Sequence, residues 1–565
     1  VVLQLDLVET ALNRAIYDSA NVRRDALPGT NLVRIEGQGP SGITDVDKAY
    51  DYLGDAYNFY ATYHGRDSYD NAGAQLVATV RYCTENTSAA CPYPNAFWNG
   101  YYEQFAFGAG FPVDDVTAHE YTHAVTSHTS GLYYMYQSGA ISESLSDIWG
   151  EFIDLTNGKG NDSSSVRWLI GEDSAAGTIR NMANPPAYDH PDRVLSPNYT
   201  CDPLFADRGG VHHNSGILNK AAYLMTDGGS FNGHFITGLG LDKTARIFYE
   251  LQTHLLTTGS EFDDVYSLLP KACYNLVGAG GITTSDCQQV VKAVTSTEMD
   301  KGSTTCGRVE GALCPAGKVA ADLFGDGFET SHDPLWDTRL ISGAADAVDA
   351  WYLSHEYASD GSRSLSNFGQ PYRADNAASM ANGVRLPIGK PTFLRFLHSF
   401  SFESLIYYGY VWLTDGGVLE YSTDSGLSWQ DAAPLVTDNG YQYYIDSVYP
   451  DFTYSDNPLA GRDAFVGSSY GWIPVRLDLS SLEGQTVRFR FRVGTDSGGG
   501  YPYYDGWFID EFRIYTCDDP TPTPTVTPTR KPTATRAPTA TRTPGPTAAP
   551  QYLPFAAKWA STLPD

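Results

Sequence analysis

Two histidines and a glutamate stand close together in the segment His119-Glu120-Tyr121-Thr122-His123. On an α-helix, an offset of four places both imidazoles on one face, one turn apart, which suits two ligands of one small metal ion. Glu120 then lies beside the metal, where its carboxylate can take a proton from an activated water and give it to a leaving amine. The pattern predicts a catalytic zinc site; the alternative is a solvated helix face that carries the same residues.

A catalytic zinc ion has three protein ligands and one open position, and Glu143 is the candidate for the third ligand. It follows His123 by 20 residues, at the expected start of a second helix. If the two helices run antiparallel around a turn from Gly131 to Gly139, Glu143 reaches the histidines. Asp147 follows one helical turn later, where it can hydrogen-bond the outer nitrogen of a ligand imidazole; otherwise it is a surface carboxylate.

The elements expected to position these residues are helices. Before residue 112, strand and loop patterns dominate, whereas helical spacing of apolar residues occurs at about 44–62, 114–129, 140–156, 214–227, 241–256 and 285–298. The first 300 residues therefore predict a two-lobed α+β unit. Its sheet-rich lobe covers 1–130 and ends in the zinc-binding helix, and its helical lobe covers 131–300. A junction rich in Cys, Gly and Pro follows at 301–316.

Residues 317–517 follow a different pattern. Val487, Phe489, Phe491 and Val493 alternate with arginines, as in a half-buried strand, and many short strands without helices predict an antiparallel β-sandwich. From 518 to 550 the chain is rich in Pro and Thr, which predicts a disordered stalk. The short tail at 551–565 is either an export or surface-attachment element or a frayed terminus.

Composition excludes some partners and indicates a compartment. The 565 residues include 37 Lys and Arg against 66 Asp and Glu, a net charge of −29, so nucleic acid and anionic membranes are poor partners. No apolar run approaches the ~20 residues of a transmembrane helix. The spacings Cys83 to Cys91 and Cys273 to Cys287 suit local disulfides of a secreted protein; the alternative is reduced, buried thiols. The first residue is Val, as in a processed product.

Five separated motifs in the first 300 residues share one likeness. They are Asn95 to Gly100, His119 to His123, Gly139 to Asp147, Ile179 to Met182, and Gly209 to Gly216. Over most of residues 25–300, this set resembles the thermolysin-like neutral zinc metallopeptidases, the gluzincins in which HExxH is followed by a downstream Glu. The resemblance implies that His119, His123 and Glu143 bind Zn²⁺, and that Glu120 is the general base and acid.

The resemblance also implies roles for residues that would be inconspicuous alone. Tyr134 and His212 would donate hydrogen bonds to the tetrahedral oxyanion, where donors aimed at developing charge contribute most. Asp207, five positions before His212, would orient that imidazole and favour its protonated form.

Substrate binding is implied in the same way. Asn95, the Ala96 backbone and Arg180 would hold the main chain of the substrate. An aliphatic pocket would favour a bulky apolar residue just after the scissile bond, with a discrimination of only ~1 to 3 kcal/mol among such residues. The pocket positions are Val116, Ile170 and Ile179.

Calcium is expected as a structural ion. Asp115, Asp154 and Glu172 match calcium positions of the family, the alternative being a surface carboxylate cluster. Arg167 and Leu169 stand where further carboxylates would be expected, which argues against a paired calcium site.

Three later segments carry a second likeness: Phe324 to Glu329, Gly417 to Gly426 and Gly506 to Glu511. They resemble the MAM-like or jelly-roll β-sandwich modules that are appended to secreted bacterial metallopeptidases. The whole sequence therefore predicts a secreted, monomeric zinc endopeptidase that acts on proteins or peptides. The sandwich is a candidate for binding a cell-surface or matrix ligand, and the stalk and tail for surface attachment.

Two alternatives stay open. One is an aminopeptidase with the same zinc ligands, although no motif supplies an acidic anchor for a free substrate amine. The other is a surface adhesion or matrix-binding protein whose β-sandwich is the working part and whose peptidase domain is vestigial. The complete catalytic set speaks against this second alternative.

Overall fold

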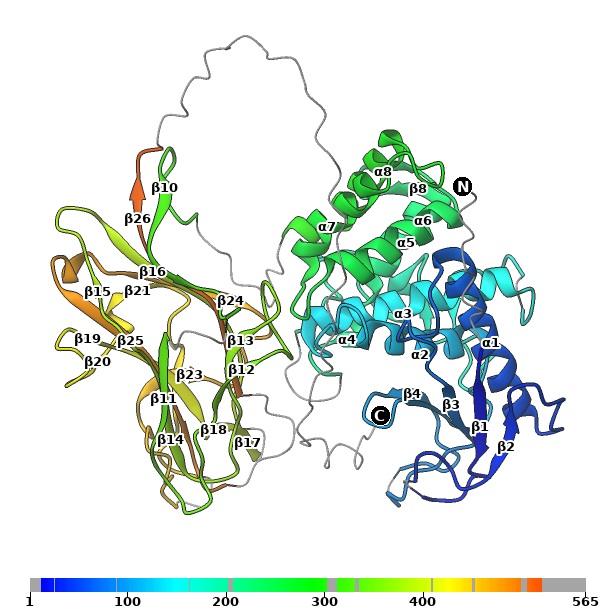
Figure 1. The fold of residues 1–565 in the computed structure, drawn as a ribbon, viewed down its shortest axis with the longest axis horizontal. Coiled ribbons are helices and arrows are strands. Elements are labelled where there is room, and N and C mark those ends of the chain that lie inside the picture. The colour runs from blue at the N-terminus through cyan, green and yellow to red at the C-terminus, as the bar shows by residue number, and fades with distance from the viewer. Residues whose placement is uncertain are drawn as a thin grey trace, which may run out of the picture.

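A computed structural model describes the chain in ten ranges: 12–24, 26–87, 89–161, 163–201, 207–301, 312–330, 335–407, 410–449, 453–498 and 506–520. The predicted stalk beyond residue 520 and the predicted tail at 551–565 lie outside these ranges. Two units lie side by side in Figure 1, an N-terminal unit up to residue 301 and a β-sandwich from residue 312. This arrangement confirms the predicted α+β unit followed by an antiparallel sandwich.

The N-terminal unit begins with a five-stranded mixed sheet, ordered β2-β1-β3-β5-β4. The β1–β3 and β3–β5 pairs are parallel, and β1–β2 and β4–β5 are antiparallel. Its strands are β1 (Arg14–Asp18), β2 (Leu32–Ile35), β3 (Leu76–Val80), β4 (Ala96–Asn99) and β5 (Gln104–Phe107). Helix α1 (Thr44–His64) packs on this sheet because Val46, Ala49, Leu53 and Ala56 recur at helical spacing and are fully buried.

Helices dominate the rest of this unit (Figure 1). They are α2 (Asp114–Ser127), α3 (Tyr136–Asn157), α4 (Val211–Asn214), α5 (Gly216–Asp227), α6 (Leu241–Glu250), a π-helical turn (Leu251–Leu255), α7 (Phe262–Asn275), α8 (Thr284–Ser296) and two 3-10 turns (Pro185–Tyr188, Met299–Lys301). Short strand pairs are β6 (Leu169–Ile170) with β7 (Arg180–Asn181), and β8 (Gly228–Phe231) with β9 (His234–Thr237).

Each predicted helical segment contains a helix, but α7 was not predicted. It carries Pro270 in its interior, a residue that removes a backbone donor and normally ends a helix. A capping box compensates at its start, where the Glu261 and Asp264 side chains satisfy each other's backbone N–H groups.

The β-sandwich consists of two antiparallel sheets. One has the order β12-β13-β26-β16-β24-β21 with β10 beside β26; the other has the order β11-β14-β25-β19-β23-β22 with β15 beside β25 and β20 beside β19. Their strands are β10 (Val319–Asp326), β11 (Trp336–Gly343), β12 (Trp351–Ser354), β13 (Ser364–Asn367), β14 (Ala374–Met380), β15 (Val384–Arg385), β16 (Thr392–Ser401), β19 (Gly416–Ser422), β20 (Gln430–Asp431), β21 (Val436–Asp438), β22 (Tyr443–Tyr444), β23 (Asp463–Val466), β24 (Ile473–Asp478), β25 (Thr486–Thr495) and β26 (Gly506–Asp518). A separate hairpin joins β17 (Ser404–Tyr407) to β18 (Tyr410–Leu413), and 3-10 turns occur at Ala433–Leu435 and Ser480–Leu482.

Aromatic side chains fill the space between the two sheets. The ring of Phe491 on β25 lies 5.2 Å from that of Phe396 on β16 and 5.3 Å from that of Trp507 on β26. Val487 and Phe489 are also fully buried, so the predicted alternation of β25 is confirmed. The arginines between them face outward, and Arg490 pairs with Glu420 at 2.5 Å.

Three disulfides connect described residues. Cys83–Cys91 and Cys273–Cys287 are the two local pairs that the spacings favoured. Cys314–Cys517 joins the segment before β10 to the end of β26. No described cysteine is free. None of the helices in the described ranges combines the length and apolar composition that a membrane crossing requires.

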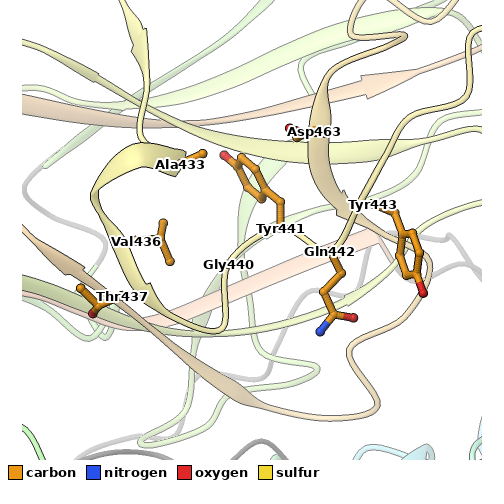
Figure 2. Close-up of a pocket in the computed structure, with 8 residues that line it drawn as sticks. All are labelled: Ala433, Val436, Thr437, Gly440, Tyr441, Gln442, Tyr443 and Asp463. Atoms are coloured by element: carbon orange, nitrogen blue, oxygen red, sulfur yellow. The ribbon is translucent and has the colours of Figure 1, made fainter.

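One pocket lies in the β-sandwich, in a different unit from the predicted zinc ligands. Figure 2 shows its lining between β21, β22 and β23, with Tyr441 and Tyr443 on one side. Tyr441 is engaged in the fold, because its hydroxyl donates to the Leu419 carbonyl at 3.2 Å and accepts from the Leu419 N–H at 2.7 Å. The remaining lining residues are Ala433, Val436, Thr437, Gly440, Gln442 and Asp463.

Candidate metal centre and active site

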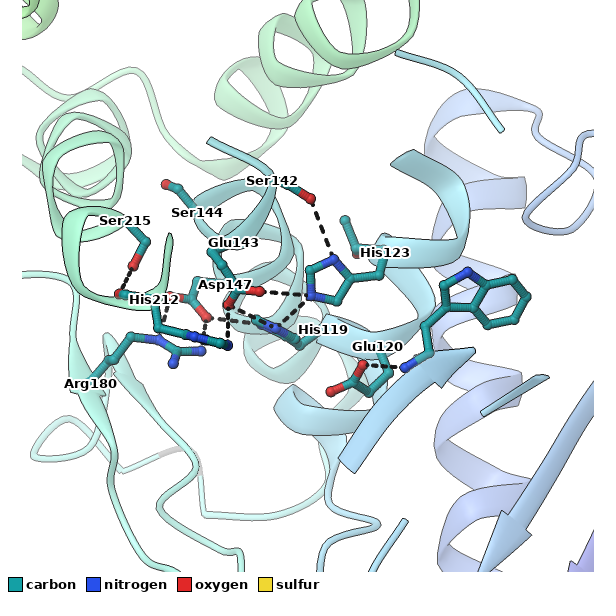
Figure 3. Close-up of polar contacts among 12 residues, drawn as sticks. His119, Glu120, His123, Ser142, Glu143, Ser144, Asp147, Arg180, His212 and Ser215 are labelled. Carbon is teal, nitrogen blue, oxygen red and sulfur yellow. Dashed lines mark hydrogen bonds and ion pairs between the residues drawn. The ribbon is translucent and has the colours of Figure 1, made fainter. Parts of the chain in front are cut away.

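Helix α2 presents His119 and His123 on one face, as their spacing predicted. Their Nε2 atoms are 3.1 Å apart, close enough to share one ion. Figure 3 shows both rings pointing toward Glu143 on α3. The two helices approach closely because Gly150 of α3 lies against α2; a Cβ there would stand 2.9 Å from the Asp115 carbonyl oxygen.

Glu143 completes a three-residue set of metal-ligand type. Its Oε1 lies 3.2 Å from His123 Nε2, and its Oε2 lies 3.5 Å from His119 Nε2. The residue is fully buried, yet Oε2 accepts no hydrogen bond from any described residue. One ligand atom from each residue lies within 4.8 Å of the others.

Electrostatics at this set favour a cation. Burial opposes ionisation of Glu143, but the imidazoles of His212, His119 and His123 hold the pKa of this carboxyl well below its usual range. Burial likewise lowers the pKa of His119, but Glu143 and Asp147 reverse the effect and raise it to about 10. Two imidazoles and one carboxylate, whose Oε2 accepts no hydrogen bond from a described residue, fit a zinc ion with three protein ligands.

Asp147 lies behind His119. Its Oδ1 is 2.9 Å from His119 Nδ1 and accepts from Arg180 Nη2 at 2.6 Å. Its Oδ2 accepts from Arg180 Nε at 2.7 Å and from Asn219 Nδ2 at 2.8 Å. Although burial opposes ionisation, Arg180 and His119 lower the pKa of Asp147 to about 2. A charged Asp147 fixes the tautomer of His119, so that Nε2 faces the metal position.

Glu120 faces away from Glu143, toward the sheet. Its Oε2 accepts a hydrogen bond from the backbone N–H of Trp98 on β4 at 2.8 Å. The residue is 6% exposed, so its carboxylate has a fixed direction in a largely dry site. Figure 3 shows Glu120 beside the two histidines on α2.

Two further side chains that can donate hydrogen bonds, Tyr134 and His212, lie next to Glu143. The Tyr134 hydroxyl donates to Glu143 Oε1 and lies 3.3 Å from His212 Nε2. His212 Nε2 is 3.5 Å from Glu143 Oε2, and its Nδ1 is 2.5 Å from Asp207 Oδ1. Burial lowers the pKa of His212, but Glu143 and Asp207 outweigh it and raise the pKa overall.

The predicted substrate-binding residues lie around this centre at different depths. Arg180 on β7 is buried and joined to the site through Asp147. Asn95 is exposed and Ala96 is the first residue of β4, the strand that contacts Glu120 through Trp98.

The three pocket positions divide between the core and the surface. Val116 on α2 and Ile170 on β6 belong to one apolar cluster. Ile179 is 41% exposed, and its N–H donates to the Ile170 carbonyl oxygen at 2.8 Å.

The predicted calcium residues belong to a larger acidic cluster. Burial, opposed only in part by hydrogen bonds from the Gly171 and Val116 N–H groups, raises the pKa of Asp115 to about 6. Burial and then neighbouring carboxylates raise the pKa of Asp154 to about 10 and that of Glu172 to about 8. Arg167 does not neutralise the three, because it pairs with Asp227 at 2.8 Å.

Four contributors were not predicted. Trp98 acts through its backbone, Ser142 Oγ lies 3.4 Å from His123 Nδ1, and Asn219 comes from a distant helix, so none of them leaves a spacing signal. Glu151 did leave one, because Glu143, Asp147, Glu151 and Asp154 repeat at helical spacing along α3. It is buried, and burial raises its pKa well above the usual range.

Comparison with protein families agrees with this geometry. Residues 20–127 match the family model of the thermolysin metallopeptidase catalytic domain, and residues 130–296 match that of its alpha-helical domain. These two stretches, which together we call the peptidase unit, are therefore similar to the two domains of the thermolysin metallopeptidases.

Known relatives are similar over about half of the chain. A zinc metalloproteinase of Renibacterium salmoninarum is 40% identical over 278 residues, which cover 46% of this chain and 50% of the relative. A thermolysin of Bacillus sp. (strain EA1) is 38% identical over 293 residues, covering 49% and 50%. The protealysin precursor of Serratia proteamaculans, a solved structure, is 30% identical with a TM-score of 0.41 and covers 51% of this chain and 88% of that one. The chain thus spans about half the length of the curated relatives it matches.

Proposed function

We propose that this protein is a secreted zinc-dependent endopeptidase that hydrolyses peptide bonds of protein or peptide substrates. The observation that carries the proposal is the set of buried His119, half-buried His123 and buried Glu143, with Glu120 fixed beside it. Bound by these three ligands, zinc would supply Lewis-acid polarisation of the peptide carbonyl and activation of water.

The residues of the chain divide the remaining work. Glu120 takes a proton from the attacking water and delivers it to the departing nitrogen. Its hydrogen bond from Trp98 keeps one carboxylate oxygen occupied, so the other is free to exchange the proton. Tyr134 and His212 donate to the oxyanion that develops on the former carbonyl, and Asp207 holds His212 in its protonated form.

Substrate selection follows from the surrounding side chains. Asn95, the Ala96 backbone and Arg180 hold the substrate main chain. Val116, Ile170 and Ile179 favour a bulky apolar residue just after the scissile bond. Since Arg180 already shares two hydrogen bonds with Asp147, its remaining guanidinium nitrogen is the one available to a substrate carbonyl.

Calcium belongs to the same proposal. Asp115, Asp154 and Glu172 form a carboxylate cluster whose raised pKa values reflect burial and mutual repulsion, which a bound Ca²⁺ would relieve. We propose one structural ion there. We further propose that the protein is a monomer and that its β-sandwich binds a cell-surface or matrix ligand. The C-terminal segment would then attach the protein to the surface.

Digestion of casein by the purified chain tests the proposal. We expect proteolysis that stops when a zinc chelator is added and returns with added Zn²⁺. Proteolysis that is insensitive to metal removal contradicts the zinc mechanism. A correctly folded chain that never cleaves casein or peptide substrates instead favours the adhesion alternative, in which the sandwich is the working part.

A further inference from the structure

Three carboxylates from distant parts of the sequence meet in the β-sandwich, and we call them the sandwich carboxylate cluster: Glu403, Asp415 and Asp496. Asp415 directly precedes β19 and Asp496 directly follows β25. These strands are antiparallel neighbours, with Gly416 opposite Gly494, so the two aspartates meet at one end of the pair. The Asp496 N–H donates to Asp415 Oδ1 at 2.9 Å.

Glu403 reaches the same point from the segment before β17. Its carbonyl oxygen accepts from the N–H groups of Thr414 and Asp415 at 3.2 and 3.3 Å, which fixes its backbone against the start of β19. One carboxylate oxygen from each of the three residues lies within 4.8 Å of the others.

The cluster is buried and lacks a protein cation. Glu403, Asp415 and Asp496 are 5%, 4% and 2% exposed. Among the described ranges, no Lys, Arg or His side chain pairs with any of them or shifts the pKa of any of them. Burying three like charges together is strongly unfavourable unless a cation or protons compensate. Burial and the neighbouring Asp496 raise the pKa of Glu403 to about 7, and burial with both neighbours raises that of Asp415 well above its usual range.

The side chain of Glu403 supplies a second, independent observation. Asp415 and Asp496 each accept hydrogen bonds, from groups that include the Asn457 amide at 3.5 Å, the Gly498 N–H at 2.6 Å and the Tyr449 hydroxyl. The Glu403 carboxylate accepts none from any described residue, although the residue is more than nine-tenths buried and points into the cluster. Because it has no hydrogen-bond donor among the described residues, this carboxylate is available to bind a cation at the cluster.

We propose that Glu403, Asp415 and Asp496 bind a calcium ion that ties the start of β17 to the ends of β19 and β25. Three oxygen ligands without histidine or cysteine select a hard cation rather than zinc. The two positive charges of Ca²⁺ offset most of the buried negative charge. This site is separate from the acidic cluster of the peptidase unit, and its existence does not depend on the proposed enzymatic activity.

Calcium stoichiometry tests this proposal. The full chain carrying E120Q, which protects it from self-cleavage, is dialysed against ⁴⁵Ca²⁺ with and without the added pair E403Q and D415N. We expect the E403Q and D415N substitutions to remove one bound calcium per chain. They should also reduce the calcium-dependent rise in Tm by about 5 °C. The matched control D463N changes an exposed aspartate of β23 and should leave both values unchanged. An unchanged stoichiometry in the folded pair variant overturns the site.

A spectroscopic measurement keeps the test valid if the pair variant does not fold. Terbium substitutes for calcium, and its emission is sensitised by a nearby tyrosine. The Tyr449 hydroxyl hydrogen-bonds to Asp496, so we expect Y449F to lower the tyrosine-excited Tb³⁺ emission at least twofold. Emission that is equal in Y449F and in the parent contradicts the proposal.

A different observation concerns the contact between the two units. The ring of Tyr133 stacks on that of Tyr357 at 4.4 Å and meets that of Phe508 at 5.8 Å. Three residues further along, the Tyr136 hydroxyl lies 2.5 Å from Ser468 Oγ. Both contacts flank Tyr134, the proposed oxyanion donor.

The peptidase unit accommodates the sandwich closely. The Ala358 N–H donates to Thr258 Oγ1 at 3.0 Å, and the Trp472 N–H donates to Glu261 Oε1 at 3.1 Å. Gly259 lies at the contact, where a Cβ would stand 2.0 Å from the Ala358 carbonyl oxygen. Tyr357 itself is 1% exposed, so its ring is enclosed by the two units together.

We also infer that Tyr357 is a positioning residue, through which the β-sandwich holds the Tyr133–Tyr136 segment and thereby aims the Tyr134 hydroxyl. This inference rests on the proposed function. Misplacing a preorganised donor by a fraction of an ångström weakens transition-state stabilisation and leaves ground-state binding largely unchanged.

A double-mutant cycle tests the inference. We expect Y357A to lower kcat about tenfold with little change in KM, and to have almost no further effect in a Y134F background. The control Y443A removes a ring that is 64% exposed in the same sandwich and should leave kcat unchanged. Equal effects of Y357A with and without Tyr134 overturn the inference. An inactive parent chain would instead refute the proposed function.

Discussion

In the peptidase unit, the buried carboxylates of Glu143 and Asp147 face imidazole and guanidinium groups, whereas in the β-sandwich Glu403, Asp415 and Asp496 face one another. Both arrangements concentrate negative charge away from water, but their chemistry differs. Nitrogen ligands with a single carboxylate suit zinc and leave its reactivity intact. Three carboxylates suit calcium, which serves as a cross-link between strands. The two sets therefore differ in the type of their ligands rather than in whether they bury negative charge.

The largest expected effect comes from removing the carboxylate ligand of the zinc set. Glu143→Gln should abolish stoichiometric zinc binding and lower proteolysis at least ~10³-fold, because the metal contributes several kcal/mol to transition-state stabilisation. Zinc content by atomic absorption and casein cleavage measure both results. Calcium binding in the sandwich should persist in this variant.

Glu103→Gln is the matched control, since that side chain is 60% exposed and lies outside the set. Full zinc content in Glu143→Gln would show that the two histidines hold the metal with another group. The proposed difference in ligand type between the zinc set and the sandwich carboxylate cluster would then be wrong.

A smaller loss of zinc affinity is expected from changing Asp147, which hydrogen-bonds the zinc ligand candidate His119. Asp147→Asn removes a charge that orients His119 and keeps Arg180 in place, so zinc affinity should fall 10- to 100-fold. Competition with a calibrated chelator measures the affinity. Asp242→Asn changes an exposed aspartate on α6 and should have no effect. An equal affinity in Asp147→Asn would mean that its charge does not support the ligand.

The smallest effect tests whether the acidic cluster near α3 resembles the one in the sandwich. Burial and neighbouring carboxylates raise the pKa of Asp154 to about 10, so without calcium the residue is protonated near neutral pH and Asp154→Asn should leave the Tm equal or slightly higher. With calcium it should fall by a few degrees, corresponding to roughly 1 to 2 kcal/mol of lost ion binding. Differential scanning calorimetry with and without Ca²⁺ distinguishes the two. A Tm that falls equally in both conditions would indicate a hydrogen-bonding role for Asp154 rather than ion binding.

Sequence patterns predicted the parts of the molecule in which spacing carries the chemistry. A helix has a period close to the offset of four between His119 and His123, and a strand has the period of two seen along Val487, Phe489 and Phe491. Both elements can therefore be predicted from the sequence alone. Helix α7 was not predicted because it contains Pro270, a residue that normally ends a helix. A helix with an interior proline depends on tertiary packing, which cannot be predicted from a local sequence pattern.

Long-range contacts explain most of what was not predicted. Asn219 meets Asp147 across 72 residues, and Glu403, Asp415 and Asp496 meet only because β19 pairs with β25. Glu151 is different, since its helical offset from Asp147 was present in the sequence. The contact of Tyr133 with Tyr357 required the placement of one unit against the other, which composition and periodicity do not determine.

The most direct test of the central claim is the kcat/KM of Glu120→Gln, measured together with its zinc content. Because Gln keeps the shape of the side chain but cannot exchange a proton, we predict unchanged zinc binding and a loss of about 10³- to 10⁴-fold in kcat/KM. A variant that retains both its zinc and its full activity would contradict the assignment of Glu120 as the proton-transfer group, and with it the proposed mechanism.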